Sequence, residues 1–72
     1  HFSMNASLLL EDAYVLTRAF SSGQKSLNDL VTAVGRYKPL QAAYLAICVQ
    51  DLLASHEAKR FRMELATQTS RK

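Results

Sequence analysis

The sequence has few of the devices that stabilise a small protein other than a hydrophobic core. Its 72 residues include one cysteine, one proline, two glycines and no tryptophan. A single cysteine excludes a disulfide framework within the chain. The longest apolar run, residues 42–49, is far shorter than a membrane span. Because a domain of this length is only marginally stable alone, its hydrophobic residues have to build one efficient core.

Positive charge is in modest excess and is unevenly placed. The net charge is +3, and the whole excess lies after residue 37, because acidic and basic side chains balance before it. This asymmetry is typical of a solvated face or a site for an acidic partner, since tight DNA binders concentrate more charge. A free cysteine without an export signal favours a cytoplasmic protein with no membrane association.

Hydrophobic spacing predicts an all-α protein that consists of one domain, residues 4–72. The residues before Met4 have the character of a vector remnant. The expected helices cover about residues 6–21, 26–35 and 39–67. The third would be much the longest, because nothing in its sequence breaks a helix.

Local signals place the boundaries of the second and third helices. Ser26 and Asp29 have the spacing of a capping box, in which each side chain accepts a backbone N–H of the other residue. Gly35 is placed to end the second helix in the left-handed conformation. Pro39 suits the first turn of the third helix, where its missing N–H costs nothing.

The third helix carries a seam of side chains spaced alternately four and three residues apart, the pattern of a coiled coil. The seam consists of Leu40, Tyr44, Ile47, Asp51, Ala54, Ala58, Phe61 and Leu65. Two shorter helices cannot cover so long a helix, so we expect a homodimer with these residues at its interface. Asp51, the one polar member, either sets the register of the dimer or lies in solvent.

The chemistry of an active site is missing. Cys48 and His56 lie eight residues apart on the predicted third helix, roughly 12 Å along its axis, so they cannot meet within one chain. One cysteine and one histidine make no structural zinc site, and there is no glycine-rich phosphate loop. We therefore expect a protein that is not an enzyme and that has no catalytic residues, metal or cofactor.

Two stretches are candidates for binding a partner protein. Arg36, Tyr37 and Lys38 link two predicted helices, and arginine and tyrosine are enriched at interface hot spots. Tyr37 could instead cover the core under the turn. Arg60 and Arg62 beside Phe61 form the second candidate, and the alternative there is a solvated face.

Binding of nucleic acid and assembly into a larger complex are the alternatives to capture of a partner protein. Residues 26–49 can be interpreted as a helix-turn-helix, although the second helix offers no arginine, lysine or asparagine between Leu40 and Val49. A subunit or co-chaperone of a secretion system would bury the seam of the third helix against a different protein.

In length and in its layout of short helices before a long one, the chain resembles the small all-helical quorum-sensing anti-activators of phages and bacteria. The long helix of residues 39–67 and its seam carry the likeness. The resemblance implies a helical dimer that captures a LuxR-type transcriptional activator, and a second host target such as a pilus motor ATPase. It transfers no functional residue, because it rests on layout and on no motif.

Overall fold

The computed structural model describes residues 5–71, which form α1 (Ala6–Ser21), α2 (Leu27–Gly35), α3 (Pro39–Leu52) and α4 (Ser55–Ser70). No strand is present among these residues, so the predicted all-α class is confirmed. None of the helices in this range is both long and apolar enough to cross a membrane. The interpretation of residues 1–3 as a vector remnant falls outside the described part of the chain.

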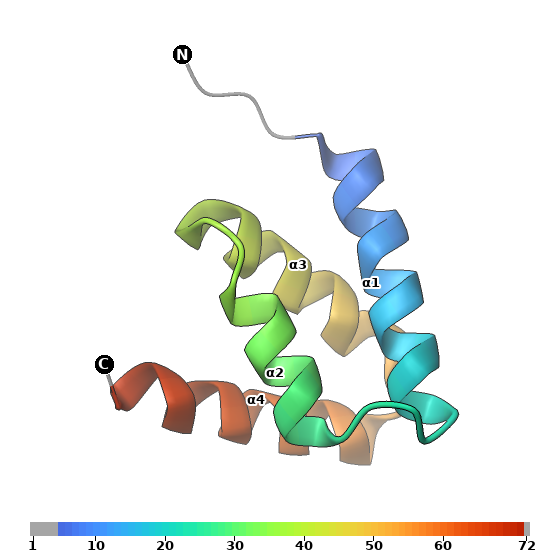
Figure 1. The fold of residues 1–72 in the computed structure, drawn as a ribbon, viewed down its shortest axis with the longest axis vertical. Helices are drawn as coiled ribbons and strands as arrows, with labels where there is room; N and C mark the ends of the chain where they lie inside the picture. The colour runs from blue at the N-terminus through green and yellow to red at the C-terminus, as the bar shows by residue number, and fades with distance from the viewer. Residues whose placement is uncertain (1–4, 72) are drawn as a thin grey trace.

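The four helices surround one core, and α4 crosses below α2 and α3 (Figure 1). α1 and α3 lie side by side and share the most extensive contact, while α2 packs against α3 and α4. α4 runs across the lower end of the bundle and contacts α2 and α3. Each helix contributes at least one fully or almost fully buried apolar side chain to the core: Ala13, Leu30, Val31, Val34, Leu45, Val49 and Phe61.

The predicted capping signals are largely confirmed. The Ser26 hydroxyl accepts the backbone N–H of Asp29 at 3.0 Å, and the Asp29 carboxylate accepts that of Ser26 at 3.3 Å. Pro39 stands in the first turn of α3. The expectation for Gly35 is wrong, because this residue is the last of α2 and the left-handed glycine is Gly23, with a φ of 84°.

The prediction of one long third helix is wrong, because the chain breaks between α3 and α4. Leu53 and Ala54 adopt extended conformations, with ψ of 153° and 152°. These two residues redirect the chain, so that α4 folds back against the core instead of extending into solvent.

Burial explains why the helix breaks without a proline or glycine. Phe61 is completely buried and Ala58 is almost so, while Leu65 packs at the margin of the core. Burying one phenylalanine contributes about 1.5–3 kcal/mol, and the packing of Ala58 and Leu65 adds to this. Together these contributions offset the backbone hydrogen bonds lost at the break, each worth about 1 kcal/mol net. Tertiary packing therefore overrides the local preference for a continuous helix.

Candidate protein-binding surfaces

The turn between α2 and α3, residues 36–38, is held in place by a hydrogen bond to α1. The Tyr37 hydroxyl donates to the Asp12 carboxylate at 2.6 Å. The tyrosine ring is half-buried and packs against the core. Tyr37 therefore covers the core under the turn, which was the alternative to a free contact residue.

This hydrogen bond also changes the acidity of the tyrosine. The bond to the Asp12 carboxylate, with burial and the negative charge of Asp12, raises the pKa of Tyr37 from its ordinary value of 10.0 to about 12. All three causes disfavour the phenolate. The turn is thus tied to α1 throughout the neutral range.

A groove of about 320 Å³ opens beside this turn, between the start of α3 and the end of α4. We call it the turn groove. Its lining comes from three helices and the turn: Val34, Gly35, Tyr37, Pro39, Ala42, Ala43, Ala46, Leu65 and Thr69. Three alanines on one side of α3 leave the space open, because their side chains end at Cβ.

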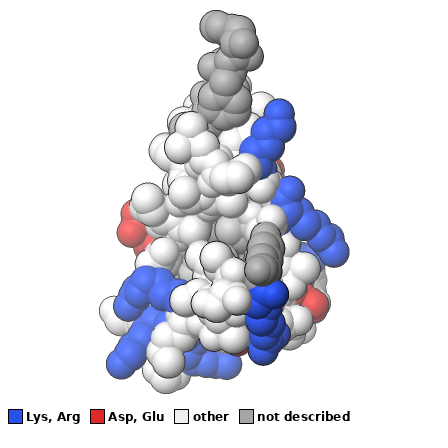
Figure 2. All heavy atoms as spheres, turned by 90° about the vertical axis from the view of Figure 1, so that its left-hand side faces the viewer, with Lys and Arg blue, Asp and Glu red and all other residues white. Residues whose placement is uncertain are grey.

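The turn groove is apolar inside and basic around its edge. Among its lining side chains only Tyr37 and Thr69 are polar, and the Tyr37 hydroxyl is already bonded. Arg36 and Lys38 stand exposed on the turn, and Arg71 follows the end of α4. None of these three makes an ion pair within the described residues. On the side of the molecule that carries the turn and the end of α4, Figure 2 shows a largely uncharged middle. Basic side chains lie at its upper right and lower edge, and acidic side chains lie to its left and right.

Polar contacts fix the end of α4, which forms one wall of the turn groove. The Gln68 amide donates to the Asn28 side chain at 2.6 Å, and its oxygen accepts the Thr32 hydroxyl at 3.5 Å. Both partners belong to α2. The α4 wall of the turn groove is therefore held in place by hydrogen bonds to α2.

A second apolar surface lies on the outward side of α3. Leu40 and Ile47 are each 59% exposed, and Tyr44 lies between them along the helix, half-buried. We call these three residues the α3 ridge. Asp51, one turn beyond Ile47, is exposed, so within one protomer it takes the solvent alternative.

The other half of the predicted seam does not continue this ridge. Ala58 and Phe61 point into the protomer's own core, Leu65 lies at its margin, and Ala54 is exposed at the break. A dimer interface along the whole seam would need Phe61 at the surface. The structure thus leaves only the first half of the seam available, and the prediction that it binds a second copy stays a prediction.

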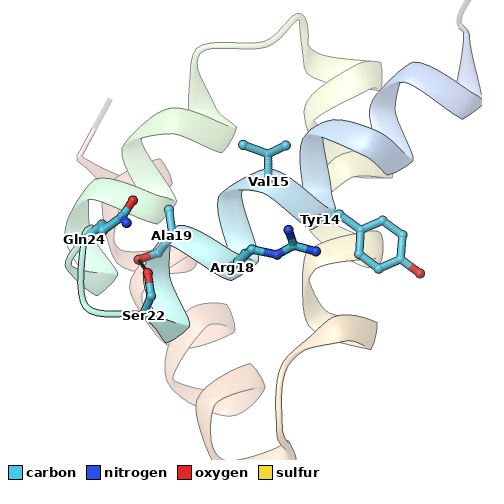
Figure 3. A pocket seen from close by; sticks show the side chains of 6 residues that line it. All are labelled: Tyr14, Val15, Arg18, Ala19, Ser22 and Gln24. Carbon is cyan, nitrogen blue, oxygen red and sulfur yellow. Dashed lines mark hydrogen bonds between the residues drawn. The ribbon is translucent and has the colours of Figure 1, made fainter.

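α1 carries a further shallow hollow, of about 400 Å³, close to its end. In Figure 3, Tyr14 and Arg18 extend to the same side of α1, and Gln24 approaches from the following loop. Val15 is 67% exposed here, and the Ser22 hydroxyl donates to the Ala19 carbonyl at 3.2 Å. No pattern in the sequence predicts this hollow, because its lining combines residues of α1 with Ser22 and Gln24 of the following loop.

The basic stretch on α4 is partly engaged within the chain. Arg60 pairs with Glu57 at 2.8 Å, and the Arg62 guanidinium donates to Gln50 at 3.4 Å. Both arginines are exposed. Their contacts fit a solvated helix face, and their role as partner contacts stays a prediction.

The cysteine and the histidine considered for catalysis lie on different helices and differ in exposure. Cys48 is half-buried on α3, whereas the His56 side chain is 83% exposed near the start of α4. Within residues 5–71 no three histidine, cysteine, aspartate or glutamate side chains are grouped to hold a metal ion.

Comparison with known proteins adds no relative. No family model matches the chain, and neither a curated protein nor a solved structure matches it significantly. The surfaces of the molecule are therefore the basis for any functional assignment.

Sequence reasoning identified Arg36–Lys38 but missed the groove beside them. The groove depends on the end of α4 meeting the start of α3, which a continuous helix would prevent. The only signal in the sequence is the group of small residues Ala42, Ala43 and Ala46 after Pro39, a pattern that core packing alone can explain.

Proposed function

We propose that the protein is a non-enzymatic inhibitor that works by binding another protein. The observation that carries the proposal is the turn groove, an apolar depression with Arg36 and Lys38 exposed at its edge. Apolar surface that stays exposed in a small protein is typical of an interaction site. Polar and charged residues around an apolar centre are the usual anatomy of a protein interface.

A transcriptional activator of the LuxR type is the favoured target of this inhibitor. This choice rests on the resemblance to the small anti-activators in length and helical content alone, because the long helix that carried the likeness is divided here at Leu53 and Ala54. The outward side of α3 supports a protein partner over DNA. It presents Leu40, Tyr44 and Ile47, none of which pairs with base edges in the major groove.

Affinity capture tests the inhibitor function. Tagged protein is incubated with bacterial lysate, the captured protein is identified, and its DNA binding is then measured with and without the inhibitor. We expect one regulator to be retained in near-equal amount and its DNA binding to fall. Retention of no protein, together with a salt-sensitive shift of random duplex DNA, would contradict the proposal and favour the helix-turn-helix interpretation.

We further propose that two copies associate through the α3 ridge. A second copy would cover Leu40, Tyr44 and Ile47, and an isologous contact uses the same patch on both chains. Analytical ultracentrifugation should give a dimer for the natural sequence and a monomer for Ile47→Glu, because a carboxylate in an apolar interface is strongly unfavourable. Val15→Glu is the matched control, since Val15 is equally apolar and exposed on α1. A monomeric natural protein, or a dimer that is lost only in Val15→Glu, would contradict the proposal that the α3 ridge is the dimer interface.

A further inference from the structure

We infer that the turn groove binds an acidic amphipathic helix of the partner, whose apolar side chains enter the groove while its carboxylates face Arg36 and Lys38. The inference rests on the proposed function, because it names the chemistry of the protein that is bound. It concerns the groove between α3 and α4 and makes no use of the α3 ridge.

The shape of the groove matches an apolar anchor. Its volume of about 320 Å³ lies at the lower end of ligand pockets, and its α3 side is formed by Ala42, Ala43 and Ala46. Small side chains on one helix let another helix approach closely. Helix-in-groove recognition uses apolar residues one turn apart on the incoming helix.

The charges around the groove determine the charge expected of the bound segment. Arg36 and Lys38, each next in the chain to lining residues of the groove, supply two cations without an ion pair in the described residues. Asp12 keeps its negative charge while it accepts the Tyr37 hydroxyl, and Glu64 approaches Gln68 on the α2 side. An acidic helix therefore meets two cations that have no ion-pair partner in the described residues, whereas a basic helix meets their repulsion.

The lining of the groove argues against a small polar ligand. Sites for small molecules place a few convergent polar groups that fix the orientation of the ligand. Here the Tyr37 hydroxyl is occupied by Asp12, so the Thr69 hydroxyl is the only polar side-chain group left in the lining. Such a site recognises shape and charge, which suits a protein segment.

Binding of a synthetic helix to the full chain tests the inference. The probe has leucine and alanine on one face and glutamate on the other, and the matched probe has lysine in place of glutamate. Amide shifts in ¹H–¹⁵N NMR spectra report both the site and the affinity. We expect the glutamate probe to shift Gly35, Ala43 and Ala46 and the lysine probe to bind at least about tenfold more weakly.

Variants of the rim and of the α3 side separate charge from shape. Arg36→Glu with Lys38→Glu should weaken binding of the glutamate probe about tenfold or more, because two attractive charges at the edge of the groove become repulsive. Arg18→Glu with Lys59→Glu is the control, because it changes the net charge equally at exposed sites away from the groove. Ala43→Glu should abolish binding, whereas Thr67→Glu, on the opposite side of α4 from Leu65, should not.

Four outcomes would overturn the inference. They are equal binding of both probes, equal effects of the two charge-reversal pairs, shifts confined to the α3 ridge or α1, and no binding of either probe. Binding of dodecanoate in place of the helices would assign the groove to a small anionic amphiphile. Equal capture of a regulator by the natural chain and by the Arg36→Glu, Lys38→Glu variant would exclude the groove as the binding site. The proposed inhibitor function would remain.

Discussion

α3 is apolar on almost every side, whereas α4 carries a single apolar stripe among charged and polar residues. α3 buries Leu45 and Val49 completely and still leaves Leu40 and Ile47 mostly exposed. α4 directs Ala58, Phe61 and Leu65 toward the core and presents Lys59 and Arg60 to solvent. The two helices follow one another in the chain, with only Leu53 and Ala54 between them.

The difference separates stability from recognition. Ala58 and Phe61 of the α4 stripe are used within the protomer, so substitutions there act on folding, whereas Leu65 also lines the turn groove. α3 has more apolar surface than the protomer can bury, and the excess lies on the ridge and in the turn groove. We therefore associate binding with the apolar side chains of α3 that remain exposed.

The largest expected effect is the loss of the aromatic anchor of α4. Phe61→Ala should lower the free energy of unfolding by about 3–5 kcal/mol, because it leaves a cavity at a fully buried site. Met63→Ala, two residues away and 63% exposed, should change it by less than about 0.5 kcal/mol. Urea denaturation compares the two variants. Equal losses would mean that α4 does not dock as described.

A smaller effect is expected from the hydrogen bond that ties the turn before α3 to α1. Tyr37→Phe should cost about 1 kcal/mol, because the Asp12 carboxylate loses its donor at the protein surface. Since the folded pKa of Tyr37 is about 12 against 10.0 ordinarily, this contribution is fully present below pH 10 and disappears as the pH rises toward 12.

Thermal unfolding between pH 8 and 12 measures the contribution of this hydrogen bond. The stability difference between the natural chain and Tyr37→Phe should shrink across that alkaline window. Tyr14→Phe is the control, because Tyr14 is half-exposed and makes no side-chain hydrogen bond within the described residues. A difference that is constant with pH would contradict the assignment of the Tyr37 proton to the bond.

The smallest effect concerns the polar contacts at the end of α4. Gln68→Ala should cost about 0.5–1 kcal/mol, because Asn28 and Thr32 of α2 lose their partner. Hydrogen exchange should rise in the last turns of α4 and remain unchanged in α1. Gln24→Ala, in the exposed loop before α2, serves as the control. Faster exchange throughout the protein would show that the contact is not local.

Local signals were enough to predict much of the fold. The capping box of Ser26 and Asp29, and Pro39 in the first turn of α3, placed two helices close to their observed positions. The prediction for Gly35 was wrong, because a helix can end without a left-handed residue when the following N–H groups donate to carbonyls of its last turn. The Arg36 N–H donates to the Ala33 carbonyl in this way.

The break and the groove could not be predicted in the same way. Residues 53 and 54 are leucine and alanine, which favour a helix, and the break accompanies the burial of Ala58 and Phe61 against the core. The turn groove follows from that break, since Leu65 and Thr69 reach the start of α3 only when α4 folds back. The exposed turn residues Arg36 and Lys38 could be found because a turn between helices has to face solvent.

Proline at residue 54 tests the break most directly. Ala54 has a φ of −61° and follows a residue in extended conformation, which are the conditions that proline requires. We predict that Ala54→Pro leaves the melting temperature unchanged or raises it, with a gain of up to about 1 kcal/mol. Ala43→Pro, inside α3, should destabilise the protein by about 3 kcal/mol or more. A similar loss in Ala54→Pro would mean that one helix runs through residues 53 and 54, and would contradict both the fold and the groove.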